Sequence, residues 1–83
     1  MTRAEIFRVV KANIERIVDG VDASAIAEEV SMRDLGADSL QIVEVVSRSM
    51  KELRLKVPRT ELSKARNLKD LLDLFENAPA GGA

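Results

Sequence analysis

The fold is decided by residues 35–53, which read LGADSLQIVEVVSRSMKEL. Asp38 is of a residue type preferred at helix N-caps, and Gln41, three residues later, fits a capping box. The sequence therefore predicts a helix over residues 39–53. Its many β-branched residues would also suit a strand, but the length of the run and its cap favour a helix. Four apolar residues are expected to form its inward face: Val43, Val46, Met50 and Leu53.

Two further long helices are predicted, one on each side of this segment. The first covers residues 3–18, where the run Thr2–Glu5 fits a capping box and Gly20 supplies a left-handed end. The last covers residues 68–76 and begins at the N-cap Asn67. Apolar residues recur at helical spacing in both. They are Ile6, Val10, Ile14, Ile17 and Val18 in the first helix, and Leu68, Leu71, Leu72 and Phe75 in the last.

The segments between these helices are predicted to be irregular or extended. Residues 19–37 form a long connection with one short helical turn near residues 23–26, and loops of this length tend to be functional. Residues 54–58 are expected to be an extended connector that buries Leu55 and Val57. Five apolar residues in the long connection are spaced as anchors on the core: Val21, Ile26, Val30, Met32 and Leu35.

Pro58 suits the first turn of a short helix over residues 59–65, in which Leu62 faces inward. The predicted fold class is therefore all-α. It is a four-helix bundle of three longer helices and one short one, with a long loop between the first and second helices. A chain of 83 residues has room for one domain. We expect that domain at residues 1–77, followed by a flexible C-terminal tail at residues 78–83.

Composition excludes several classes of chemistry. The chain contains no Cys, which excludes disulfides, thiolate metal sites and cysteine nucleophiles, and no His, which removes the usual general base and the Ser-His-Asp triad. The carboxylates Asp34, Asp38 and Glu44 lack the regular ligand spacing of a calcium loop, so no metal site is predicted. We therefore expect a protein that is not an enzyme. Because no apolar run approaches the ~20 residues that span a bilayer, we expect it in the cytoplasm.

Charge is distributed unevenly, although the formal net charge is only −1. Residues 19–47 carry seven acidic side chains and one basic one, whereas residues 48–69 carry eight basic and two acidic ones. The basic run suits nucleic acid, an acidic partner, a solvated surface or contacts with the acidic segment. Nucleic acid is disfavoured because Phe7 and Phe75 are the only aromatic residues and the chain has no overall positive charge.

Ser39 is the residue on which a functional interpretation concentrates. Its hydroxyl lies just inside a predicted helix N-terminus, where unpaired N–H groups and the helix dipole favour a phosphodiester. Gly36 permits a tight turn before that helix. No His, Lys or Arg stands beside Ser39 in the sequence to activate it as a nucleophile. These features indicate an acceptor that another enzyme modifies.

The run Leu35–Leu40, in the middle of an all-helical chain of this size, resembles the acyl carrier proteins, and the resemblance covers residues 3–77. It implies that Ser39 carries 4′-phosphopantetheine, transferred from coenzyme A by a Mg²⁺-dependent phosphopantetheinyl transferase. The arm's thiol then holds an acyl chain as a thioester, which suits a chain without Cys. The resemblance also implies a partner-recognition face: Asp38, Leu40, Gln41, Val43, Glu44 and Ser47.

A second resemblance involves residues 55–68, which look like discrete carriers of polyketide pathways. They are most similar to donor carriers of β-branching cassettes, where a hydroxymethylglutaryl (HMG)-synthase-like enzyme installs a carbon branch. This resemblance implies a small acyl cargo such as acetyl. Its partners would be a loading acyltransferase or ligase and a ketosynthase or HMG-synthase-like enzyme. Fatty-acid carriers usually have an acid soon after the Leu, whereas here Gln41 and Ile42 follow and the first acid is Glu44.

Other interpretations stay open at this point. A peptidyl carrier of nonribosomal peptide synthesis would use the same arm chemistry. A small helical interaction or DNA-binding module would use the basic run instead and would bind DNA in a salt-dependent manner. For Leu40 and Ile42, contact with a partner and burial in the core are equally favoured. We expect a monomer that binds neither nucleic acid nor membranes.

Overall fold

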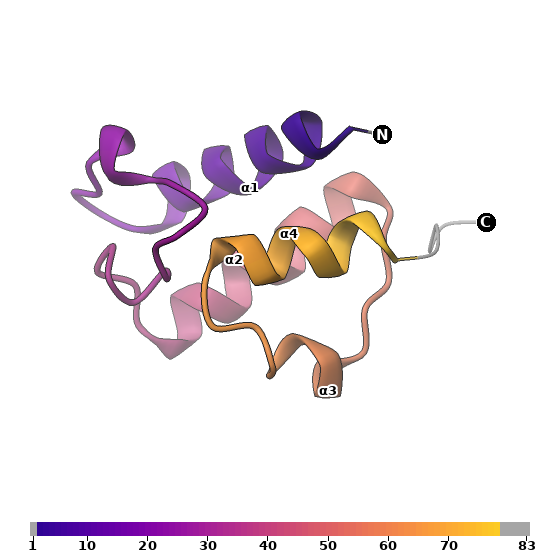
Figure 1. Ribbon diagram of the computed structural model, residues 1–83. Helices are drawn as coiled ribbons and strands as arrows, with labels where there is room; N and C mark the ends of the chain where they lie inside the picture. The colour runs from indigo at the N-terminus through magenta and orange to yellow at the C-terminus, as the bar shows by residue number, and fades with distance from the viewer. Residues whose placement is uncertain (1, 79–83) are drawn as a thin grey trace.

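The computed structural model describes residues 2–78, which form four α-helices and one short 3₁₀-helix (Figure 1). In Figure 1, α1 lies across the top, α4 and α2 lie beneath it, and α3 lies at the bottom. Helix α1 packs against both α2 and α4, and α3 packs against α4. The predicted all-α four-helix bundle is confirmed. The elements are α1 (Arg3–Ile17), η1 (Ala23–Ala25), α2 (Ser39–Leu53), α3 (Arg59–Leu62) and α4 (Leu68–Glu76).

Helix α1 begins and ends close to the predicted positions. The Thr2 hydroxyl accepts the backbone N–H of Glu5 at 3.2 Å, as a capping residue should. In a full capping box the Glu5 carboxylate would accept the backbone N–H of Thr2. Here it accepts the Thr2 hydroxyl instead, so only one of the two predicted capping bonds forms. The helix ends at Ile17, one residue earlier than predicted, and Gly20 adopts a φ of +72° beyond it. Its apolar stripe lies in the core with one polar residue, Asn13.

Helix α2 has the predicted bounds and the predicted capping box. The Gln41 N–H donates to the Asp38 carboxylate at 2.8 Å, and the Asp38 N–H donates to the Gln41 side-chain oxygen at 2.9 Å. The Gln41 amide also donates to the Ile17 carbonyl at 3.3 Å. This bond ties the start of α2 to the end of α1.

The predicted inward face of α2 is wrong at Val43. That side chain is 59% exposed, whereas Val45, Ser49 and Leu53 are buried and Val46 and Met50 are half-buried against the core. The predicted inward face contained only apolar residues and so did not include Ser49. In the structure its hydroxyl accepts a hydrogen bond from the buried Asn13 amide at 3.1 Å, which makes its burial acceptable. The inward face is therefore centred on Val45 and Ser49.

The long connection between α1 and α2 is irregular apart from η1, as predicted, and its anchors pack against the core. Ile26 and Met32 are buried, and Val21, Val30 and Leu35 are partly buried against the same cluster. The connection is also joined to α4 through its backbone. The Leu68 and Lys69 N–H groups donate to carbonyls of residues 30 and 28, at 2.9 Å and 2.8 Å. The apolar side chains of the long loop thus fix it to the core, and its backbone carbonyls fix it to the start of α4.

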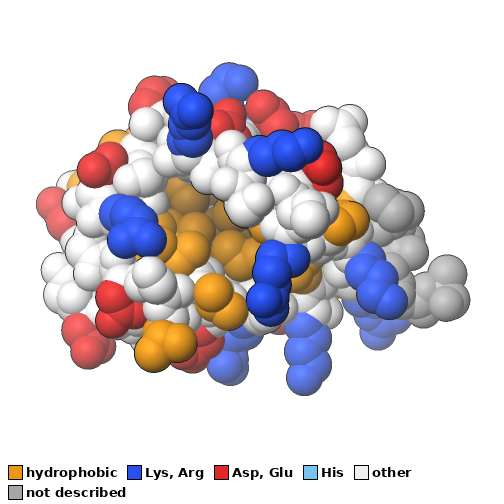
Figure 2. All heavy atoms as spheres, turned by 90° about the horizontal axis from the view of Figure 1, so that it is seen from below, with side chains coloured by type: hydrophobic (Ala, Val, Ile, Leu, Met, Phe, Trp, Pro, Cys, Tyr) orange, Lys and Arg blue, Asp and Glu red, His pale blue; other side chains and the backbone are white. Residues whose placement is uncertain are grey.

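The segment after α2 departs from prediction in detail. Leu55 and Val57 are only half-buried, and Pro58 is the N-cap of α3 rather than part of its first turn. Helix α3 ends at Leu62 instead of residue 65, because the chain then tightens into turns with hydrogen bonds between residues three apart. Leu62 is half-buried against the core. An apolar hollow is visible on the face of the molecule seen in Figure 2.

Helix α4 has the predicted N-cap, bounds and inward residues. The Asn67 side chain accepts the Asp70 N–H at 2.9 Å, and the helix ends at Glu76. Its four predicted core residues are all buried. Of the predicted tail, residues 79–83 lie outside the described residues, so the boundary at residue 77 stays a prediction. No helix among residues 2–78 is long and apolar enough to cross a membrane.

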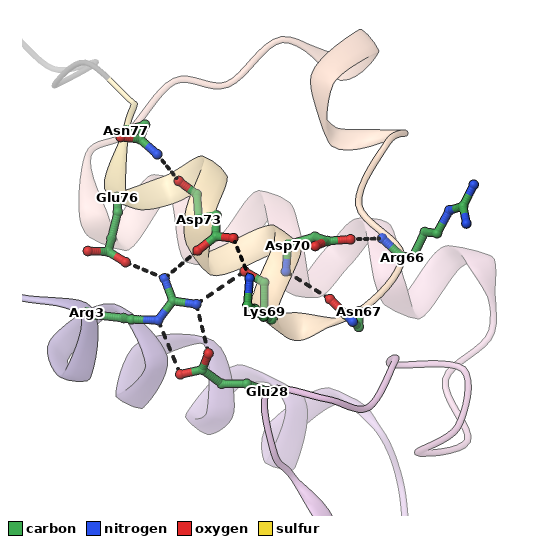
Figure 3. Close-up of polar contacts among 9 residues, drawn as sticks. All are labelled: Arg3, Glu28, Arg66, Asn67, Lys69, Asp70, Asp73, Glu76 and Asn77. Carbon is green, nitrogen blue, oxygen red and sulfur yellow. Dashed lines mark hydrogen bonds and ion pairs between the residues drawn. The ribbon is translucent and has the colours of Figure 1, made fainter.

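A cluster of charges around Arg3 joins three parts of the chain (Figure 3). The Arg3 guanidinium pairs with Glu28 of the long connection at 2.8 Å, with Asp73 of α4 at 2.8 Å, and with Glu76. Hydrogen bonding to Arg3 lowers the pKa of Glu28 and of Asp73, and the carboxylates raise the pKa of Arg3. Glu28 of the acidic connection therefore pairs with Arg3 of α1, and no ion pair among the described residues joins the connection to the basic run of residues 48–69.

Candidate functional site

Ser39 is the first residue of α2 and its side chain is exposed. The chain reaches it through a turn in which the Ala37 N–H donates to the Met32 carbonyl at 3.0 Å and Gly36 adopts a φ of +99°. Only glycine adopts such a φ without strain. No hydrogen bond among the described residues takes up the backbone N–H of Ser39 or Leu40. These two donors and the helix dipole favour an anion at the Ser39 hydroxyl.

Arg33 lies beside Ser39, which the sequence interpretation missed. The Arg33 guanidinium donates to Ser39 Oγ at 3.2 Å. A reciprocal pair of hydrogen bonds between Ser31 and Asp34, and a bond from the Gly36 N–H to the Arg33 carbonyl, shape the turn that brings it there. The signal that could have revealed Arg33 was its place as the only basic residue between positions 19 and 47.

The chemistry of this pair is that of an acceptor with an anion-stabilising neighbour. An arginine side chain stays protonated in proteins and cannot remove the proton of Ser39. It offers instead a fixed positive charge and several N–H donors, which suit a phosphate oxygen. The surroundings of the Ser39 hydroxyl therefore suit a negatively charged group attached to it.

Most of the predicted partner-recognition residues share one exposed side of α2. Leu40 is 81% exposed and Val43 59% exposed, and both are large apolar side chains. They recur with Glu44 and Ser47 at the three- and four-residue spacing of one helix face, and Asp38 is exposed just before it. Gln41 is different, because its amide is engaged by the cap and by α1.

Ile42 lies away from this exposed face and lines an open cavity of about 420 Å³. The cavity lies between the turn of residues 31–33, α2, α3 and the segment 65–71. Arg33 lines it as well, so the cavity begins beside Ser39. Figure 2 shows the recessed apolar surface with Lys and Arg side chains around it. Leu40 and Ile42, which the sequence left undecided, thus have different surroundings: solvent for one and a cavity wall for the other.

The described residues contain no group of three acidic side chains placed to hold a metal ion. Asp34 accepts the Ser31 N–H, and Asp38 accepts the Gln41 N–H, so each of these carboxylates has a structural role.

Comparison with known families and proteins gives consistent matches. A family model described as the phosphopantetheine attachment site matches residues 9–75. The polyketide biosynthesis acyl-carrier-protein AcpK of Bacillus subtilis is 32% identical over 75 residues, which cover 90% of this chain and 92% of AcpK. The acyl carrier protein of Thermotoga maritima is 38% identical over 76 residues, which cover 90% of this chain and 93% of that protein.

A solved structure is similar in fold over nearly the same region. It is the crystal structure of the curacin biosynthetic pathway HMG synthase in complex with acetyl donor-ACP. One of its chains matches with a TM-score of 0.79 and 31% sequence identity, over 90% of this chain and 96% of that chain.

Proposed function

This chain belongs to the acyl carrier proteins, which share the phosphopantetheine attachment domain, and on that premise we propose that Ser39 carries the 4′-phosphopantetheine arm. The observation that carries the proposal is the exposed Ser39 hydroxyl at the open N-terminus of α2, with Arg33 at 3.2 Å. The arm supplies a thiol that holds an acyl group as a thioester. The protein thus acts as a carrier rather than as a catalyst, and it works in the cytoplasm, where thiols stay reduced.

The attachment step needs a base from outside this chain. A bond forms between Ser39 Oγ and the phosphorus that bears pantetheine in coenzyme A, and the pyrophosphate bond to adenosine 3′,5′-bisphosphate breaks. The hydroxyl proton leaves to a base of the phosphopantetheinyl transferase, since the chain has no His and Arg33 cannot accept a proton. Arg33 and the free N–H groups of α2 favour the phosphodiester charge once it is in place.

The pathway proposal is that this carrier serves polyketide biosynthesis as a donor carrier of a β-branching cassette. Its support is the similarity to AcpK and to a chain of the curacin HMG synthase complex. The partner enzyme would then be an HMG-synthase-like protein, and the cargo a small acyl group such as acetyl. Peptidyl carriers share the arm chemistry, so the decisive difference lies in which enzyme accepts the cargo.

The proposed docking surface is the exposed side of α2 next to the arm. Asp38, Leu40, Val43, Glu44 and Ser47 lie there, and Gln41 holds the start of the helix in position. Two exposed apolar side chains close to charged ones are typical of a transient protein contact. A partner bound on this side would lie beside Ser39, where the arm begins.

Intact-mass measurement tests both the attachment and the pathway. The folded chain, incubated with coenzyme A, Mg²⁺ and a broad-specificity transferase, should gain one phosphopantetheine. Ser39→Ala should gain nothing while keeping its helical circular dichroism, and Ser24→Ala, which changes another exposed serine, should gain as the wild type does. A gain in Ser39→Ala, or none in unmodified wild type, would refute the attachment site.

The second stage uses the acetyl-loaded chain and the curacin HMG synthase. The acetyl mass should leave the carrier faster than it leaves the acetyl-loaded Thermotoga maritima carrier, which is a relative of similar identity. Transfer at equal rates from both carriers would contradict the β-branching assignment and leave the attachment site intact.

A further inference from the structure

The cavity next to Ser39 combines an apolar wall with positive charge. Three arginines line it, Arg33, Arg59 and Arg66, and none of its described lining residues is acidic. The whole chain contains 14 acidic residues and 13 basic ones, so this concentration of one sign is local. The side chains between the arginines are mostly aliphatic: Met32, Ile42, Val46, Leu62, Leu68 and Leu71.

The positive charge of the cavity is not neutralised within the described part of the chain. No ion pair among residues 2–78 includes Arg33, Arg59 or Arg66. In Figure 3 the Arg66 side chain extends away from the neighbouring carboxylates, and only its backbone N–H bonds Asp70. Arg3 differs from these three arginines, because its guanidinium forms ion pairs with three carboxylates.

Arg33 connects this cavity to the attachment point. Its guanidinium lies 3.2 Å from Ser39 Oγ, and the same residue lines the cavity. A group attached to Ser39 therefore starts at the cavity edge. With a volume of about 420 Å³, the cavity falls within the size range of small-molecule sites.

We propose that this cavity receives the end of the phosphopantetheine arm when the arm carries a short acyl group with a free carboxylate. This rests on the proposed attachment at Ser39. The methylene groups at the end of the arm lie on the aliphatic wall of the cavity. The carboxylate of the acyl group pairs with Arg59 and Arg66, whose planar guanidinium groups match carboxylate geometry. Arg33 remains with the phosphodiester.

The same charges set the specificity. A neutral acyl group contacts the apolar wall of the cavity but leaves Arg59 and Arg66 without an anion. The cavity therefore binds it more weakly than a carboxylated group. An acetyl group, which is both short and uncharged, stays available to a partner enzyme. The carrier thus shields a carboxylated cargo and exposes an uncharged one.

The test compares the chain loaded with malonyl and with the length-matched propionyl group, each confirmed by intact mass. Thioester reaction with hydroxylamine is measured and divided by the rate of the same acyl group on coenzyme A. After this correction the malonyl form should react at least about twofold more slowly than the propionyl form. Amide resonances of Leu62 and Leu71 should shift more in the malonyl form than in the propionyl form. Because salt screens exposed charge pairs, the difference should disappear near 1 M salt.

Two matched variants locate the effect. Arg59→Gln/Arg66→Gln should remove the malonyl protection. Arg8→Gln/Arg16→Gln removes the same charge from exposed positions of α1 that do not line the cavity, and it should leave the protection unchanged. Equal protection of both cargoes, or equal loss in both variants, would overturn the proposal. Failure to gain the acylated arm would instead refute the attachment at Ser39.

Discussion

At the scale of single residues, Asp38 has two roles that can be separated. Its carboxylate accepts the Gln41 N–H at 2.8 Å, which satisfies one of the free donors at the start of α2. Its negative charge also lies on the proposed docking side, one residue before Ser39. The cap needs only a hydrogen-bond acceptor, whereas recognition by charge needs the ionised form.

Asp38→Ala should lower the free energy of unfolding by about 1 kcal/mol, because the cap is lost. Asp38→Asn should change it by only a few tenths of a kcal/mol, since asparagine caps a helix about as well. Urea denaturation followed by circular dichroism measures both variants. Equal destabilisation by Asn and Ala would mean that the charge, not the acceptor, stabilises the helix start.

At the scale of elements, α2 divides its apolar residues between two environments. Val45 is fully buried next to Ser49, while Val43 is on the exposed side with Leu40. The two residues have the same side chain and lie two positions apart in one helix, so their substitutions can be compared directly. Burial in the core stabilises Val45, whereas Val43 lies on the proposed docking side.

Val45→Ala should cost roughly 2 kcal/mol of unfolding free energy, because it leaves a cavity in the core. Val43→Ala should stay within about 0.5 kcal/mol of wild type, as exposed substitutions usually do. The measurement is urea denaturation of the two variants under identical conditions. A larger loss from Val43→Ala would show that the sequence-based assignment of the inward face was correct after all.

At the scale of the whole molecule, the Arg3 cluster holds α1, the long connection and α4 together. These contacts join residues far apart in the sequence, and they are partly exposed, so salt and pH act on them. The pKa values of Glu28 and Asp73 are lowered in the folded protein. A lowered carboxylate pKa contributes stability that is present above the ordinary pKa and is lost as pH falls through the folded one.

Arg3→Gln should therefore lower the melting temperature at neutral pH, and its difference from wild type should shrink below about pH 4. Arg8→Gln on the same helix, whose side chain forms no ion pair among the described residues, serves as the control. The measurement is thermal unfolding between neutral pH and about pH 3. If the Arg3→Gln difference were constant over that range, the cluster would not be its cause.

Local chemistry made much of this protein predictable from sequence. The first residues of α2 and α4 follow from the N-caps Asp38 and Asn67, whose capping bonds span only three residues. The inward residues of α4 follow from helical periodicity, because its polar residues all lie on one side. The candidate attachment residue was identified in the same way, since a serine after an N-cap is a local pattern.

Tertiary structure alone decided the rest, because it depends on contacts between distant residues. The burial of Ser49 is tolerated because Asn13, 36 positions earlier, supplies its hydrogen-bond donor. Arg33 reaches Ser39 only because the preceding turn reverses the chain. The arginine-lined cavity needs four segments to meet, and no spacing within any one of them reveals it. Sequence therefore determined the helices and the candidate acceptor serine, and packing determined what surrounds that serine.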